Sequence, residues 1–158
     1  MSETTNASAV VDEGTFTVQR TIHINATLEK VWAAVTEPAL ISQWFGRADF
    51  DGSGPGAVGT LSWDDHGSFP VRIEAVDAPR SITYRWSNDD ALGAIPDTLD
   101  EATSTVFTFT LEAMDVGTQL TVVETGFENT SNPLANLNDH RDGWNAELDE
   151  LVALVEGL

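Results

Sequence analysis

A chain of 158 residues is long enough to form one domain with a buried core, and the lack of cysteine excludes a disulfide framework and a thiolate nucleophile. Twenty-six acidic residues against seven Lys and Arg give a formal net charge of −19, which argues against nucleic acid and anionic membranes as partners. No apolar run reaches membrane-spanning length and the first residues do not form a signal peptide pattern, so we expect a cytoplasmic protein.

The acidic residues are scattered along the chain, which is typical of a solvated surface. A single lysine, Lys30, among so many acids also fits a high-salt cytoplasm, although an ordinary acidic protein is the commoner case. Residues 1–14 are small, polar and without a period, and we expect them to be disordered. Nothing divides the remainder, so residues 15–158 are predicted to form a single domain.

A strand and two short helices are predicted at the start of this domain. In TFTVQRTIHI (15–24) alternating apolar residues share one face of a strand, which Arg20 interrupts. Thr27 can cap a helix over residues 28–36, because its hydroxyl can accept a hydrogen bond from a free backbone N–H. A second helix, over residues 38–45, begins with proline, which suits a first helical turn.

Alternating apolar residues separated by turns fill the middle of the chain, which predicts an antiparallel meander. The predicted strands cover residues 57–63, 69–76, 81–86, 103–114 and 118–127. An acidic loop over residues 88–102 connects the third of these strands to the fourth. The alternation places a set of large apolar residues on the inner face: Leu61, Trp63, Tyr84, Trp86, Phe107 and Phe109.

A long helix is predicted at the C-terminus, over residues 139–158. Its apolar residues recur at steps of three and four and share one side of the helix: Trp144, Leu148, Leu151 and Val155. No other predicted element is long enough to cover a curled sheet, so we expect this apolar side to pack on the concave face. We interpret the small Gly143 as allowing the helix to approach the sheet closely.

Four segments resemble, in the same order, blocks of a known family. They are TIHINATLEKVWAAVTEPALISQWFG, VRIEAVDAPRSITYRW, GTQLTVVETGF and GWNAELDELVAL. The family is the activator of heat-shock protein 90 ATPase homologue family, within the SRPBCC (START-like, Bet v allergen-like) superfamily, and the similarity runs over residues 15–158. The resemblance implies an α+β helix-grip fold, in which a curved antiparallel β-sheet of about seven strands wraps around a long C-terminal α-helix. It also implies two short helices after the first strand and a cavity between sheet and helix.

Inward aromatic residues would line the cavity that the resemblance implies. The candidates for ligand contact are Leu61, Trp63, Tyr84, Trp86, Phe107, Phe109 and Trp144. Such apolar walls suit a small hydrophobic or amphipathic molecule. The alternative interpretation is a filled core in which the same side chains only pack against one another.

Polar residues at apolar positions are the second set of candidates. Arg20 interrupts a strand face, Glu124 shares the parity of inward residues, and His140 and Arg141 lie one turn before Trp144. A buried charge needs a partner, so an Arg–Glu pair in the cavity could orient a polar head group or serve acid–base chemistry. The interpretation we favour is that these side chains lie near element ends and reach water.

Other chemistry is not predicted. His23, His66 and His140 lack metal-ligand spacing, and no serine lies in a nucleophile-elbow motif. The glycine-rich GSGPGAVG has neither the lysine of a phosphate loop nor a following helix, so it is interpreted as a strand connection. We therefore predict no metal, no cofactor and no catalytic residue.

Three functions follow from the predicted fold. The first is a non-catalytic cytoplasmic protein that binds a small hydrophobic or amphipathic ligand between the sheet and the C-terminal helix. The second is an enzyme of the polyketide cyclase or hydrolase type, which would use Arg20, Glu124 or His140 in the same cavity. The third is a co-chaperone that stimulates an ATPase of the heat-shock protein 90 type, as the name of the similar family implies.

Overall fold

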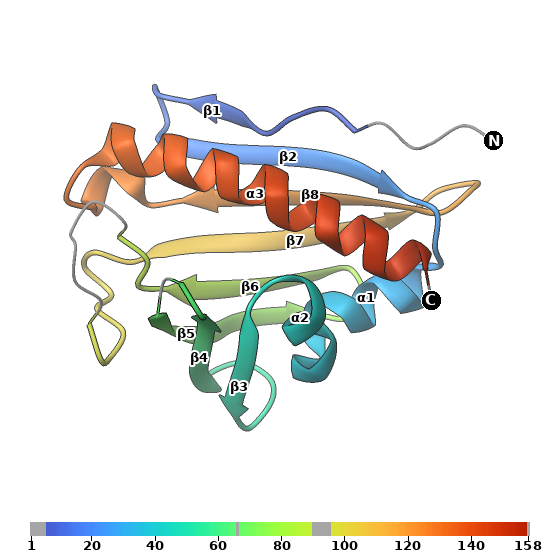
Figure 1. Cartoon of the computed structure of the whole chain (residues 1–158), viewed down its shortest axis with the longest axis horizontal. Helices are drawn as coiled ribbons and strands as arrows, with labels where there is room; N and C mark the ends of the chain where they lie inside the picture. The colour runs from blue at the N-terminus through green and yellow to red at the C-terminus, as the bar shows by residue number, and fades with distance from the viewer. Residues whose placement is uncertain (1–5, 66, 90–95, 158) are drawn as a thin grey trace.

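The computed structural model describes residues 6–65, 67–89 and 96–157. Over these residues the chain forms one antiparallel sheet, which a long C-terminal helix crosses (Figure 1). The strands are β1 (Val10–Asp12), β2 (Thr17–Ile24), β3 (Arg47–Asp51), β4 (Val58–Trp63), β5 (Gly67–Asp77), β6 (Ser81–Trp86), β7 (Thr105–Ala113) and β8 (Thr118–Thr125). The helices are α1 (Leu28–Thr36), α2 (Pro38–Trp44), the short 3₁₀ helix η2 (Phe127–Asn129) and α3 (Pro133–Glu156).

The sheet has eight strands in the order β1-β2-β8-β7-β6-β5-β4-β3, and every neighbouring pair is antiparallel. The strand at the start of the domain, β2, therefore lies beside the last strand, β8, while β4 to β7 follow one another as a meander. Helix α3 crosses the sheet over β2. Helices α1 and α2 lie towards the C-terminal end of α3 (Figure 1). This arrangement confirms the predicted helix-grip fold.

Local sequence explains the two short helices as predicted. The Thr27 hydroxyl accepts a hydrogen bond from the backbone N–H of Lys30 and caps α1, and proline is the first residue of α2. Trp44, at the end of α2, donates its indole N–H to the backbone oxygen of Ala34 in α1 at 2.8 Å. The two helices are therefore held as one unit beneath α3.

Two short strands were not predicted as separate elements. β1 lies within the segment 1–14, for which disorder was the expectation, and β3 follows α2 directly. Tertiary contacts order the first of them: the backbone N–H of Ala9 donates to Asn145 of α3, and Arg20 donates to the backbone oxygen of Ala7. Ala9 and Asn145 are 136 residues apart in the sequence, so the local pattern of residues 1–14 does not reveal their contact.

The apolar side of α3 packs in the concave face of the sheet, as predicted. Trp144, Leu148, Leu151 and Val155 are all buried. The helix begins earlier than predicted, at Pro133, because the side chain of Asn132 caps it by accepting from the backbone N–H of Ala135.

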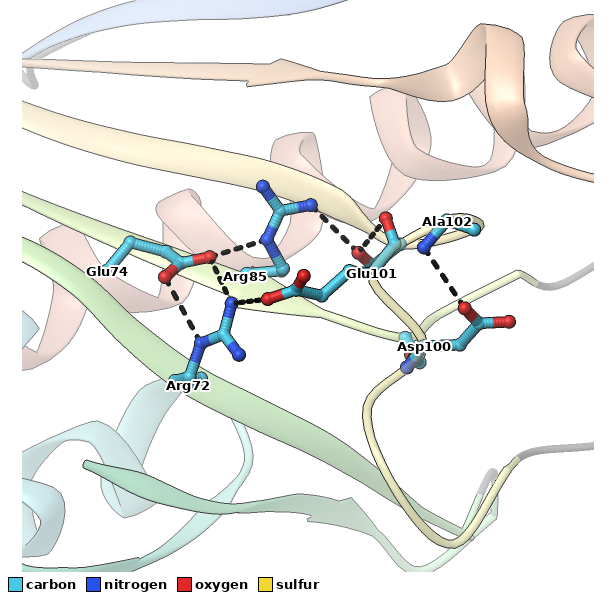
Figure 2. Close-up of polar contacts among 8 residues, drawn as sticks. Arg72, Glu74, Arg85, Asp100, Glu101 and Ala102 are labelled. Atoms are coloured by element: carbon cyan, nitrogen blue, oxygen red, sulfur yellow. Dashed lines mark hydrogen bonds and ion pairs between the residues drawn. The ribbon is translucent and has the colours of Figure 1, made fainter. Parts of the chain in front are cut away.

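On the outer face of the sheet, a charged network fixes the chain before β7 (Figure 2). Glu74 of β5 accepts hydrogen bonds from Arg72 and from Arg85 of the neighbouring β6, and Arg72 also pairs with Glu101. The hydrogen bond from Arg72 is the main reason that the pKa of Glu74 lies below its ordinary value. The end of the acidic loop is thus held against the strands whose other face forms the site described next.

Candidate functional site

A pocket of about 530 Å³ lies between the N-terminal half of α3 and the end of the sheet formed by β4, β5 and β6. Its volume falls in the range of roughly 300–1,000 Å³ found for small-molecule sites. It is lined by Phe45, Trp63, Phe69, Trp86, Asn88, Asp139, His140, Gly143, Trp144 and Glu147. The sheet and the end of α2 supply aromatic side chains, and α3 supplies most of the polar ones.

The spacing along α3 explains which helical residues face the pocket. Gly143 and Trp144 lie three and four residues after His140, and Glu147 lies four and three residues after them, so all four lie on one side of the helix. On the opposite wall, Trp63 ends β4 and Trp86 ends β6, on strands that flank β5. Because β4 and β6 both run antiparallel to β5, these two strand ends lie at the same end of the sheet.

Gly143 has a different role from the predicted one. Apart from its chain neighbours and the nearby backbone of α3 itself, no heavy atom of the described residues lies within 4 Å of the position that a Cβ atom would occupy there. The interpretation that Gly143 allows close packing against the sheet is therefore wrong. The missing side chain instead leaves space on the pocket wall.

Phe45 and the tryptophans form a continuous aromatic wall. The ring of Phe45 stacks on Trp144, with ring centroids 5.4 Å apart and an interplanar angle of 25°. It also meets Trp63 edge to face at 5.2 Å and Trp86 at 5.7 Å. Each ring is held by at least two others, so the apolar part of the pocket is preformed.

The predicted cavity residues divide into two groups. Trp63, Trp86 and Trp144 line the pocket. The other four surround a separate void of about 10 Å³, which holds about one water molecule at most: Leu61, Tyr84, Phe107 and Phe109. Those four form a packed core, as the alternative interpretation has it.

Behind the pocket lies the carboxylate of Glu124 on β8, which is fully buried. Four donors surround it: the indole N–H groups of Trp86 and Trp144 at 2.9 Å each, the hydroxyl of Thr105 at 2.6 Å, and Nδ1 of His140 at 2.8 Å. They come from three different elements, β6, β7 and α3. One carboxylate with about four acceptor sites therefore joins the helix to the sheet.

The hydrogen bonds of His140 define its charge. Its Nε2 lies 3.0 Å from the backbone oxygen of Asn88, which can only accept, so Nε2 carries a proton. Nδ1 faces the Glu124 carboxylate and must also carry a proton if that carboxylate is ionised. Burial alone would raise the pKa of Glu124, but the charge and hydrogen bond of His140 outweigh burial, and the pKa is lowered. The two residues therefore form a buried ion pair, and the favoured expectation that they reach water is wrong.

Arg20 is also buried, but it does not pair with Glu124. Its guanidinium donates to Asp149 Oδ1 at 2.8 Å and to the backbone oxygens of Trp144 and Asn145 at 3.3 and 3.1 Å. The predicted Arg–Glu pair is thus replaced by two pairs, Arg20 with Asp149 and His140 with Glu124. Arg20 holds α3 against β2 outside the pocket.

Arg141 is not among the residues that line the pocket, and it pairs with its neighbour Asp142, which is exposed. Of the four polar candidates, His140 is the one that lines the pocket and Glu124 lies directly behind it.

Two oxygen atoms in the pocket have no hydrogen-bond partner. Within the described part of the chain, Asn88 Oδ1 and Glu147 Oε2 are the buried side-chain atoms in this condition. Burial, with a smaller contribution from the charge of Glu150, raises the pKa of Glu147 to about 8. The sequence analysis missed both residues. The signal for Glu147 was its position three residues after Trp144 and seven after His140, on the same side of the helix.

The remaining candidates lie elsewhere. His23 contacts the backbone oxygen of Val116 at the far end of β2, and His66 lies outside the described residues. Among the residues that the structure describes, no group of three or more His, Cys, Asp or Glu could hold a metal ion, and no helix is long and apolar enough to cross a membrane. The glycine-rich segment connects β3 to β4, as predicted.

A curved antiparallel sheet around a long C-terminal helix, with a pocket between them, defines a START-like domain of the SRPBCC superfamily. The chain belongs to the family described as activator of Hsp90 ATPase homolog 1-like protein, whose model matches residues 25–156. The comparison with curated proteins found no match.

Solved structures show the same fold. Protein MLL2253 from Mesorhizobium loti is 26% identical with a TM-score of 0.74, over 89% of this chain and 97% of that one. DynU16, from the dynemicin biosynthetic locus, is 24% identical with a TM-score of 0.72, and the match covers 89% of this chain and 47% of DynU16. CalU16 from Micromonospora echinospora is 20% identical with a TM-score of 0.68, over 99% and 86% of the two chains.

Proposed function

We propose that the protein is a cytoplasmic binding protein for a small hydrophobic or amphipathic molecule, held in the pocket between the sheet and α3. The pocket itself is the observation that carries this proposal: it has room for a ligand, aromatic walls and a few polar groups at one side. A ligand that buries alkyl groups there gains about 0.8 kcal/mol for each methylene. The preformed wall around Phe45 lowers the entropic cost of binding.

Substitutions at Gly143 test the proposal, because this residue lines the pocket and a side chain there would meet no atom outside its own helix. Native mass spectrometry of the purified protein and a thermal-shift screen of lipids and aromatic compounds identify a binder. Gly143→Leu fills the pocket and is expected to lower the affinity for that binder at least about tenfold. Gly143→Ala adds one methyl group and is expected to change the affinity less than about threefold. Failure of every compound to co-purify or shift the melting temperature would overturn the proposal.

An enzyme of the polyketide cyclase or hydrolase type is the second candidate, and the His140–Glu124 pair favours it. His140 is at the pocket wall, and its Nε2 proton, now donated to the Asn88 backbone oxygen, could be donated to a substrate oxygen instead. Arg20 is not a candidate acid, because Asp149 and backbone oxygens hold its guanidinium.

The enzyme hypothesis is tested once a turnover is found. His140→Gln is then expected to lower kcat by about 100-fold or more, as for removal of a general acid, while Arg141→Gln on the exposed side leaves it unchanged. Equal activity in the two variants would exclude His140 as the acid. The co-chaperone function stays a prediction, to be decided by binding to the host chaperone and stimulation of its ATPase.

A further inference from the structure

The charges that face the pocket are mainly negative. Its charged or titratable lining residues are Asp139, His140 and Glu147. The charge of His140 is matched by Glu124 directly behind it, at 2.8 Å. Among the described residues that line the pocket, none is Lys or Arg. An anionic head group would therefore meet carboxylates and find no cation of its own, whereas a cationic one would meet an unmatched acid.

The unpartnered atoms of the pocket are both acceptors. Glu147 Oε2 and Asn88 Oδ1 are buried away from water without a donor. A buried acceptor left unpaired destabilises the empty pocket, because it has lost its hydrogen bonds to water. A ligand with N–H groups pairs with both oxygens, whereas a carboxylate or phosphate head has no donor for Asn88 Oδ1 and pairs with Glu147 only while that carboxyl keeps its proton.

The apolar wall also suits a positive charge. Three indoles, those of Trp63, Trp86 and Trp144, line the pocket within one aromatic cluster. The faces of aromatic rings attract cations, and indole does so most strongly. The same rings pack well against an alkyl or aryl group.

We propose that the pocket takes an amphipathic cation, an alkyl or aryl molecule with a primary ammonium group, which donates to Glu147 Oε2 while its apolar part lies against Trp63, Trp86 and Trp144. This inference rests on the proposed binding function and names its ligand class.

The protonation of Glu147 supports the assignment. Its pKa of about 8 means that the empty pocket keeps a proton on this carboxyl at neutral pH. Glu150, Asp139 and His140 are the titratable groups near it on α3, and the residues that line the pocket from α2 and the sheet do not titrate. An ammonium ion favours the ionised carboxylate, so the proton is released on binding. Affinity for an amine that stays charged is therefore expected to rise from pH 6 to pH 8.

Three probes that share a ten-carbon chain and differ in their head group test the preference: decylamine, 1-decanol and decanoate. Their binding is measured by isothermal titration calorimetry at about 0.15 M sodium chloride, which screens the charged surface beyond roughly 8 Å. Decylamine is expected to bind at least about tenfold more tightly than decanoate, with 1-decanol between them. Glu147→Gln is expected to reduce the preference to about threefold or less. The matched control Glu112→Gln, an exposed change on β7 outside the pocket, leaves the preference unchanged.

The outcomes separate this inference from the proposed function. If decanoate binds as tightly as decylamine, or if Glu147→Gln keeps the full preference, the cationic ligand class is wrong and the hydrophobic pocket stands. If Glu112→Gln removes the preference as strongly as Glu147→Gln does, the amine is bound by surface charge, and the inference is again wrong. If none of the three probes binds, the inference is wrong, and the screen of lipids and aromatic compounds decides the proposed function separately.

Discussion

Glu124 joins β8 to α3 through one carboxylate that an uncharged amide could not replace. Its four donors include two indole N–H groups, which can only donate, so an uncharged amide at this position would bring an N–H against an N–H. The charge of His140 would also lose its counter-ion. The stability of the pocket floor thus depends on one buried ion pair and its hydrogen bonds.

We predict that Glu124→Gln lowers the free energy of unfolding by about 3–5 kcal/mol, the usual cost of removing one partner of a buried charge pair. Urea denaturation monitored by circular dichroism measures the change. Glu112→Gln is the control for the same chemical substitution at an exposed site, and it should stay within about 0.5 kcal/mol of the wild type. A loss below about 1 kcal/mol for Glu124→Gln would contradict the account of this pair.

The raised pKa of Glu147 predicts that the stability of the protein depends on pH. Its pKa is raised from about 4.5 to about 8 in the folded protein, so the folded state holds a proton that the unfolded state releases at lower pH. The contribution of Glu147 to stability is therefore lost as pH rises through this window. Glu147→Gln lacks that loss, and its melting temperature should increase relative to the wild type from pH 5 to pH 8. A difference that is constant over this range would show that Glu147 titrates normally.

At the scale of elements, α3 carries a glycine in its interior that neither packing nor backbone conformation requires. Helical glycine costs about 0.5–1 kcal/mol relative to alanine, and a Cβ at Gly143 meets no described atom. We predict that Gly143→Ala raises the unfolding free energy of the empty protein by about 0.5–1 kcal/mol, measured by urea denaturation. Gly117→Ala should do the reverse, because Gly117 has a φ of 77° and its Cβ would clash with the backbone oxygen of Ile24. Destabilisation by Gly143→Ala would contradict the open position of this residue.

The elements that sequence analysis predicted are those with a local signal. Periodicity and caps predicted α1, α2, the meander and the apolar side of α3. β1 and β3 are short edge strands, of three and five residues, and their order depends on partners distant in sequence. The start of α3 at Pro133 was missed because residues 138–143, which are polar or glycine, separate Leu137 from Trp144 and interrupt the apolar pattern.

At the scale of the whole molecule, the net charge of −19 opposes the compact state, because folding brings carboxylates together. Most of them have no basic neighbour, since seven Lys and Arg are too few to pair with all of them. Screening shortens the reach of this repulsion from about 30 Å at 0.01 M salt to about 3 Å at 1 M. We predict that the melting temperature rises clearly over this range of sodium chloride, measured by differential scanning calorimetry. A flat or falling curve would mean that local ion pairs compensate the acids.

The candidate site was predictable only in part, because it depends on how α3 lies against the sheet. Strand alternation correctly placed Arg20 and Glu124 on the inner face, where their strands are paired. It could not show that α3 brings Asp149 to one of them and His140 to the other. For the same reason it counted Tyr84 and the phenylalanines among the cavity residues, although α1 and α2 cover them, together with Trp63 and Trp86 at the strand ends, which do line the pocket.

The position of the ligand pocket is tested most directly by the indole N–H signals of the five tryptophans in a ¹⁵N–¹H correlation spectrum during a titration with decylamine. Trp63, Trp86 and Trp144 line the pocket, whereas Trp32 and Trp44 do not. The account predicts saturable shifts for the first three signals, much smaller shifts for the other two, and loss of the response in Gly143→Leu. Equal shifts in all five, or shifts confined to Trp32 and Trp44, would contradict a ligand site between α3 and the strand ends.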